Sequence, residues 1–163
     1  PYFIPINKHG LNSRENILRL EELFASDKCI VIFPSGLVSR RKRGIVQDLE
    51  WRKTFVTKAK KYNKPIYPIY ISGQNSNRFY KIAKWRSLLG IKINLEMFFL
   101  VDEMFKQKGN TIEITMGKLI EPKFLDNKKN DSEWAQVIKN YVYNIKNNIN
   151  LEFIESIKNE KNY

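Results

Sequence analysis

The sequence predicts an α/β fold whose mainly parallel central sheet is covered by helices. Short apolar runs rich in β-branched residues alternate along the chain with segments that have helical periodicity. Strands joined by helices are usually parallel, and their burial on both faces favours continuous apolar runs over strict alternation. With 163 residues, 42% of them hydrophobic, the chain can bury the core of one such domain.

The expected strands are short, and one of them carries proline. Four strands are expected: residues 2–6, 28–33, 65–72 and 111–116. The second is an uninterrupted apolar run, so Cys29 within it is expected to be a buried core thiol. Because proline cannot donate to the ladder, Pro65 and Pro68 place the third at a sheet edge, at a bulge or against a ligand.

Helices are expected where apolar residues recur every three to four positions. The first should begin at a capping box formed by Asn12 and the glutamate three residues later, and the second after Asp48, a good N-cap. A third is expected over residues 78–89 and should end at Gly90, which tolerates the left-handed conformation common after helices. Further helical segments are expected in two places: residues 94–105 and the run that starts at Asp131.

Positive charge is concentrated in the middle of the chain. The sequence contains 29 Lys and Arg against 17 Asp and Glu, a net charge of +12. Residues 40–64 hold ten basic and two acidic side chains, and residues 78–92 hold five basic side chains and no acidic one. Such a field suits phosphate groups, whether on lipid headgroups, nucleic acid or a soluble ligand.

A long loop follows the second expected strand. It begins Phe33-Pro34-Ser35-Gly36 and continues into four consecutive cations, Arg40 to Arg43. Ligands of parallel sheets bind beyond the carboxyl ends of the strands, and arginine pairs bidentately with phosphate oxygens. The loop is therefore a candidate anion site, although a merely solvated basic loop would have the same composition.

Several other chemistries lack their motifs. No glycine pattern matches a dinucleotide-binding or P-loop fingerprint, and no Cys/His cluster is suited to zinc. Cys29 is the only cysteine, which excludes an internal disulfide, and no apolar run approaches the roughly 18 residues of a membrane span. His9 is the only histidine, so the residues show an anion site without an evident catalytic base.

The expected helix over residues 78–89 mixes aromatic and basic side chains. Phe79, Tyr80 and Trp85 alternate with lysine and arginine. Rings beside cations suit the interface of a membrane. The same pattern also suits a helix that packs one face on its own sheet, and the sequence leaves both alternatives open.

Four short segments, taken together, form a recognisable set. In chain order they are Ile4-Pro5-Ile6-Asn7-Lys8, Phe33-Pro34-Ser35-Gly36 with Ser39-Arg40, Trp51-Arg52-Lys53-Thr54-Phe55 and Ile66-Tyr67-Pro68-Ile69. They resemble the second to fourth sequence blocks of the lysophospholipid acyltransferases, the family related to 1-acylglycerol-3-phosphate acyltransferase, over residues 2–120. Ser35 stands where the family usually has glutamate, which favours a divergent subgroup.

Two more segments resemble a bacterial, hemolysin-like subgroup. They are Asp48-Leu49-Glu50-Trp51 and Asp102-Glu103-Met104-Phe105-Lys106. Members of that subgroup are linked to O-acylation in lipids that contain amino acids.

The resemblance implies a glycerolipid acyltransferase-like fold and a set of substrate-binding residues. Lys8 and Arg40 would hold the phosphate or carboxylate of the acceptor, and Pro68 would help to shape the acyl or acceptor groove. The implied substrate-binding residues are Lys8, Phe33, Pro34, Ser35, Gly36, Ser39, Arg40 and Pro68.

The family's catalytic block, His-x-x-x-x-Asp, is not present in this chain, and we expect it upstream of Pro1. His9 is followed five positions later by Arg14. Because the chain begins with Pro1 directly before the expected strand of residues 2–6, we expect it to lack the N-terminal part of the domain and to be inactive alone. Residues 1–125 would then be the C-terminal part of an acyltransferase domain, and residues 126–163 a C-terminal helix with a frayed tail.

The activity implied for the whole enzyme is transfer of an acyl group to the hydroxyl of a lysophospholipid or amino-acid lipid. The donor would be acyl-ACP (an acyl carrier protein thioester) or acyl-CoA, and no metal or redox cofactor is expected. The enzyme would act as a peripheral protein on an anionic membrane surface, at its cytoplasmic face. The alternative function is a basic, nucleic-acid-binding α/β module, although the chain matches no known recognition motif for nucleic acids.

Overall fold

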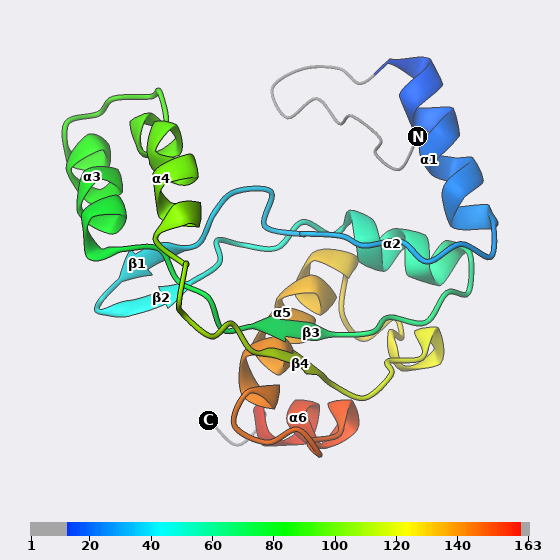
Figure 1. Ribbon diagram of the computed structural model, residues 1–163. Helices are drawn as coiled ribbons and strands as arrows, with labels where there is room; N and C mark the ends of the chain where they lie inside the picture. Colours follow the sequence, from blue (N-terminus) through cyan, green and yellow to red (C-terminus); the bar gives the residue numbers. More distant parts are fainter. Residues whose placement is uncertain (1–12, 161–163) are drawn as a thin grey trace.

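The computed structural model describes residues 13–160, and its helices surround two small sheets (Figure 1). In chain order the elements are α1 (Arg14–Ala25), β1 (Arg40–Lys42), β2 (Ile45–Gln47), α2 (Thr54–Lys61), β3 (Ile69–Ile71), α3 (Asn77–Leu88), η1 (Leu95–Phe99), α4 (Leu100–Phe105), β4 (Ile114–Met116), η2 (Pro122–Phe124), α5 (Asp131–Ile145) and α6 (Phe153–Glu160). The α/β class is as expected.

The observed strand pairs are antiparallel, and no parallel sheet is found within residues 13–160. β1 pairs with β2 as a hairpin, and β3 pairs with β4. The strands expected at 65–72 and 111–116 therefore exist in shorter form, but they run in opposite directions. The reason is the connection between them. After β3 the chain forms a helical hairpin and then enters β4 beside the end at which it left β3 (Figure 1). A parallel pair would need a crossover to the opposite end of the sheet.

The expected buried strand at residues 28–33 is an extended and exposed segment. Val31 and Phe33 are 74% and 75% exposed, and Cys29 is exposed rather than a core thiol. Apolar side chains are buried in a strand only where neighbouring strands or helices cover them. None of the four described strands pairs with this segment.

Several expectations fall on the first twelve residues, which lie outside the described part of the chain. They concern Pro1, upstream of which the catalytic block is expected, and the strand of residues 2–6. They also concern Lys8 as an acceptor contact and His9 as the only imidazole. The structure tests none of these, so each of them stays a prediction.

The helix boundaries follow local capping, with two corrections. Ser13, and not Asn12 as expected, is the N-cap of α1. Ser76 caps α3, which ends before Gly90 (φ +68°) as expected. Asp48 does not cap α2, which begins only at Thr54. The carboxylate of Asp48 instead accepts hydrogen bonds from the Ser39 hydroxyl (2.6 Å) and the Trp51 indole (2.9 Å), so it is unavailable to helix amides.

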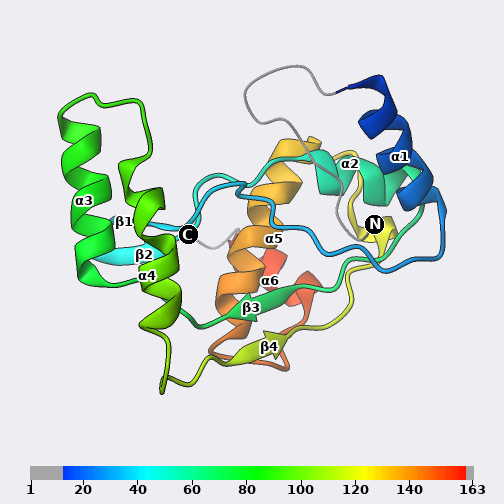
Figure 2. The ribbon, with the colours of Figure 1, turned by 45° about the horizontal axis from the view of Figure 1, so that its top comes forward.

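Helix α5 is the centre of the hydrophobic core. It packs against α2, β3 and α6 (Figures 1 and 2). Trp134, Ile138, Tyr141 and Ile145 recur at helical spacing along its buried face. Gly117 is closely packed here, because a Cβ at that position would lie 3.1 Å from the side chains of both Ile145 and Pro68, tighter than an ordinary contact.

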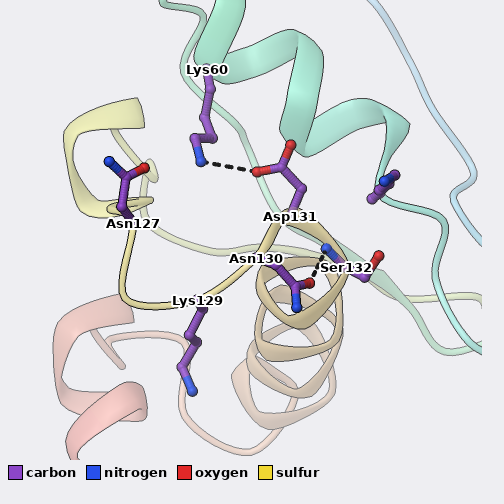
Figure 3. A pocket seen from close by; sticks show the side chains of 7 residues that line it. Lys60, Asn127, Lys129, Asn130, Asp131 and Ser132 are labelled. Carbon is purple, nitrogen blue, oxygen red and sulfur yellow. Dashed lines mark hydrogen bonds and ion pairs between the residues drawn. The ribbon is translucent and has the colours of Figure 1, made fainter.

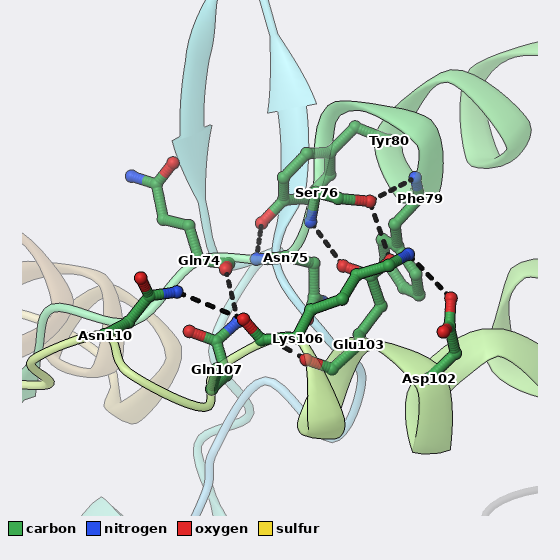
Figure 4. Close-up of polar contacts among 10 residues, drawn as sticks. All are labelled: Gln74, Asn75, Ser76, Phe79, Tyr80, Asp102, Glu103, Lys106, Gln107 and Asn110. Carbon is green, nitrogen blue, oxygen red and sulfur yellow. Dashed lines mark hydrogen bonds and ion pairs between the residues drawn. The ribbon is translucent and has the colours of Figure 1, made fainter.

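Helices α3 and α4 form a hairpin, joined through η1, that projects from the rest of the molecule (Figures 1 and 2). A buried carboxylate fastens its base (Figure 4). Glu103, on α4, accepts hydrogen bonds from the Ser76 backbone amide and hydroxyl at the start of α3, and Lys106 donates to it at 3.0 Å. Burial disfavours the charge, but these hydrogen bonds outweigh burial and hold the pKa of Glu103 below its ordinary value.

The attachment of the hairpin should therefore depend on pH. A carboxylate with a lowered pKa stabilises the folded state above its ordinary pKa of 4.5, and this contribution is lost as the pH falls through the folded-state value. We expect Glu103→Gln to lower the free energy of unfolding at neutral pH and to have progressively less effect in acid. Urea unfolding of both proteins across this range measures the difference. A difference that stays constant with pH would contradict the role of the Glu103 charge.

Candidate functional site

The loop that the sequence singles out begins with a tight turn. The Gly36 amide donates to the Phe33 carbonyl at 3.2 Å, and the Ser35 hydroxyl donates to the Leu37 carbonyl at 2.9 Å. Gly36 has φ +66°, a left-handed conformation that residues other than glycine rarely adopt. The turn thus leaves Phe33 exposed and directs the Ser35 hydroxyl to its own backbone.

Arg52 lies beside this turn. Its backbone amide donates to the Pro34 carbonyl at 3.1 Å, and a Cβ placed on Gly36 would be 3.8 Å from its Nε. The Arg52 side chain is exposed, and no carboxylate within residues 13–160 forms an ion pair with it. Arg52 was not among the predicted site residues, although it belongs to the third matching segment. The missing signal is spatial, because 16 positions separate Arg52 from Gly36 in the sequence.

Helix α5 holds the segment that leads into Arg52. The Gln136 side chain exchanges hydrogen bonds with the Trp51 backbone amide (3.2 Å) and carbonyl (2.8 Å). Lys139 donates to the Asp48 carbonyl at 2.6 Å, and the Tyr143 hydroxyl accepts from the Asp48 amide at 2.8 Å. Burial lowers the pKa of Lys139 and raises that of Tyr143 to about 12.

The Asp48-Leu49-Glu50-Trp51 motif is therefore a docking segment. Residues 136, 139 and 143 are spaced so that they share one face of α5, and each of them binds the motif's backbone. These contacts hold the backbone at Trp51, directly before Arg52. Helix α5 therefore helps to place the backbone of Arg52, whose side chain is exposed, beside the Pro34–Gly36 turn.

Arg40, another predicted site residue, is engaged within the fold. Its Nη2 donates to Glu96 at 2.6 Å, and its Nη1 donates to the Val38 carbonyl at 2.8 Å. Glu96 is fully buried and also accepts from Arg86 Nε at 2.9 Å. Burial lowers the pKa of Arg40, an effect that the Glu96 charge opposes. Its assignment as an acceptor contact stays a prediction.

The remaining predicted residues are distributed unequally. Ser39 and Pro34 are half-buried near the turn, whereas Pro68 is buried against Gly117 and α5. Pro68 thus packs in the core at the strand, away from solvent. Lys8 lies outside the described residues. The structure thus brings Pro34 and Gly36 together with Arg52, whereas Arg40 contacts Glu96 and Pro68 packs against Gly117.

Much of the basic field is neutralised by acidic residues that are distant in sequence. Glu21 on α1 pairs with Lys58 and Lys61, and Asp131 pairs with Lys60 at 2.9 Å. Apart from Arg40, which pairs with Glu96, the cations of the β1–β2 hairpin are different, because no carboxylate within residues 13–160 forms an ion pair with them. Among them, Arg41 donates to Asn77 and lies over the Tyr80 ring, and neither partner is a carboxylate.

Two hollows lie at the junction of α2 and α5. One, of about 630 Å³, lies where α5 begins (Figure 3). Its Lys60 is paired with Asp131, and its Asn130 caps α5. Lys53 and Lys129 also line it, and neither forms an ion pair within residues 13–160. The other, of about 400 Å³, is lined by residues 50–54 and Ser132 and therefore adjoins Arg52. Within residues 13–160, no cluster of acidic, histidine or cysteine side chains is suited to hold a metal ion.

Comparison with known proteins agrees with the four-segment resemblance. A family model described as acyltransferase matches residues 1–152, and the chain belongs to that family. It is 44% identical over 145 residues to the lyso-glycine lipid O-acyltransferase of Phocaeicola vulgatus and 39% identical over 145 residues to that of Bacteroides thetaiotaomicron. Each match covers 89% of this chain and 52% or 53% of the relative, so the chain spans about half of their length. No solved structure matches significantly.

Proposed function

We propose that this chain is the acceptor-holding part of an O-acyltransferase that acylates the hydroxyl of a lyso-glycine lipid. The observation that carries the proposal is the 39–44% identity to two curated proteins of that activity, over 89% of the chain. The donor would be a thioester, either acyl-ACP or acyl-CoA. The proposed enzyme works as a peripheral protein at the cytoplasmic face of an anionic membrane. None of the helices within residues 13–160 has the length and apolarity of a membrane span.

The proposed reaction is a direct acyl transfer. The hydroxyl oxygen of the acceptor attacks the thioester carbonyl, an ester C–O bond forms and the C–S bond breaks. A general base takes the hydroxyl proton, and the departing thiolate gains a proton. His9 is the only imidazole in the chain and lacks an aspartate five positions on, so the proposal assigns the base to a His-x-x-x-x-Asp block upstream of Pro1. The reaction needs no metal or redox cofactor.

The residues near the turn suit an acceptor of this kind. A glycine that is linked to an acyl chain through its nitrogen keeps a free carboxylate. Arg52 offers a planar, exposed guanidinium beside Gly36, where the missing side chain permits a close approach. Ser35 stands where the family usually has glutamate, so no carboxylate at that position repels the anion. Lys8 is the further proposed contact.

Acceptor competition tests the proposed function in the full-length protein. Equal amounts of a lyso-glycine lipid and 1-acylglycerol-3-phosphate are offered with acyl-ACP or acyl-CoA, and the products are resolved by mass spectrometry. We expect acylation of the glycine lipid. Exclusive acylation of the phosphate lipid would refute the acceptor assignment. Absence of transfer to both, together with salt-sensitive binding to DNA, would support the nucleic-acid-binding alternative.

A further inference from the structure

The α3–α4 hairpin exposes an apolar surface to solvent. Trp85, on α3, is 64% exposed, and Phe98, on the connecting η1, is 78% exposed. Leucine and isoleucine side chains continue this surface through the connecting segment at the tip, which lies far from the core around α5 (Figure 1). The ten exposed residues of this hairpin surface are Trp85, Leu88, Leu89, Ile91, Ile93, Leu95, Phe98, Val101, Met104 and Phe105. Monomeric proteins rarely leave apolar surfaces of this extent exposed.

The charge around the hairpin surface is positive. Residues 78–95 contain five basic and no acidic side chains, and Lys81 and Lys84 on α3 are exposed. The acids of the hairpin do not offset them at its surface. Glu96 and Glu103 are buried, and Asp102 pairs with Lys106 at 2.6 Å. An anionic partner would therefore find both apolar contact and electrostatic attraction here.

We infer that the hairpin surface docks on an anionic lipid bilayer. The apolar side chains of the tip would enter the boundary between headgroups and acyl chains, and the lysines of α3 would remain at headgroup depth. A second copy of the chain is a poorer partner, because pairing two such surfaces would bring together eight exposed cations that form no ion pair within residues 13–160, four from each copy: Arg78, Lys81, Lys84 and Lys92. The choice of a lipid partner rests on the proposed function, whereas the geometry and charge do not.

Tryptophan fluorescence reads this contact directly. Of the three tryptophans, Trp51 and Trp134 are 9% and 3% exposed, so Trp85 alone should respond to a new surface contact. We expect vesicles of phosphatidylcholine mixed with phosphatidylglycerol to shift its emission to shorter wavelength and brominated acyl chains to quench it. Vesicles of phosphatidylcholine alone should bind more weakly. These lipids contain no hydroxyl acceptor, so the result is independent of acyl transfer.

Matched variants locate the surface. We expect the triple variant Leu88→Ser, Phe98→Ser and Val101→Ser to reduce vesicle binding by about tenfold or more. Each substitution removes apolar area that would be buried in the bilayer on docking. Val31→Ser, Ile114→Ser and Ile149→Ser, comparably exposed outside the hairpin, should leave binding unchanged. Lys81→Gln with Lys84→Gln should weaken binding to anionic vesicles by about 25-fold, at about 1 kcal/mol for each charge. Circular dichroism confirms that each variant is folded.

Three outcomes would overturn the inference. The first is no response of Trp85 to anionic vesicles. The second is a blue shift that appears with protein concentration alone and coincides with dimers in sedimentation, which would assign the surface to a second copy. The third is a full-length protein in which Trp85 is already shielded before vesicles are added. Failure of acyl transfer with normal vesicle binding would instead count against the proposed function only.

Discussion

Acyl transfer by residues 1–163 alone should be undetectable under conditions in which the full-length protein turns over. Loss of a positioned general base typically slows a reaction by about 10²–10⁴-fold. His9, the only histidine, has Arg14 where the orienting aspartate would be, so it cannot form the His-x-x-x-x-Asp pair. Release of free thiol from the acyl donor, measured with and without a lyso-glycine lipid, gives the rate of transfer for the 163-residue chain and for the full-length protein.

A substitution separates His9 from the proposed base. In the full-length protein, His9→Gln should leave the rate of transfer unchanged, because this histidine has no assigned part in the chemistry. Substitution of the histidine in a His-x-x-x-x-Asp block upstream of Pro1 should abolish transfer. Robust turnover by the 163-residue chain, lost on His9→Gln, would show that the base lies within these residues.

Glu96→Gln should be among the most destabilising single substitutions in this fold. The Glu96 carboxylate is fully buried between Arg40 and Arg86, at 2.6 and 2.9 Å. Removal of one partner from a buried ion pair leaves uncompensated charge and typically costs about 3–5 kcal/mol. Here two guanidiniums would lose their shared partner, which joins β1, α3 and η1. Urea unfolding measures the change in the free energy of unfolding. The comparison holds where both proteins show the same dependence of that free energy on urea concentration.

Asp102→Asn is the matched control for Glu96→Gln. Asp102 also forms an ion pair in the hairpin, with Lys106, but both side chains are exposed. Exposed pairs contribute about 0–1 kcal/mol, so the control should stay close to the wild type. If the two variants lose the same stability, Glu96 is not an organising charge.

The same geometry changes how Arg40 should be tested. Arg40→Ala would break the contact with Glu96 and leave that carboxylate short of a partner, so lost activity would mix binding with stability. Arg52 has no carboxylate partner in the described part of the chain and gives a cleaner test of acceptor binding.

Local pattern predicted most of the helices and the positions of two strands, but it placed the start of α2 too early and did not separate α6 from α5. Periodicity located α1, α3 and α5, and Gly90 marked the end of α3. The direction of strand pairing was wrong, because an apolar run records burial and not the path of the chain between strands. The run at residues 28–33 has the composition of a buried strand, yet composition alone does not supply a covering element.

Contacts between distant residues set the limit of prediction for the candidate site. Asp48 is an excellent N-cap in isolation, but Ser39 and Trp51 bind its carboxylate and Tyr143, 95 positions later, binds its amide. Likewise, the basic residues between positions 40 and 64 resemble a free anion site in the sequence, but in the fold Glu21 forms ion pairs with two of their lysines. The resemblance located the Pro34–Gly36 turn, whereas Arg52 became a candidate only through the fold.

Acceptor binding by residues 1–163, without any donor, tests most directly whether the turn and Arg52 hold the anion of the acceptor. A soluble, short-chain lyso-glycine lipid and its methyl ester are titrated into the wild type, Arg52→Ala and Lys53→Ala. We expect the wild type and Lys53→Ala to bind the free acid, and Arg52→Ala or esterification to weaken binding by about 10- to 150-fold, equivalent to about 1.5–3 kcal/mol for a charged hydrogen bond. Equal affinity for acid and ester, unchanged by Arg52→Ala, would contradict the proposal.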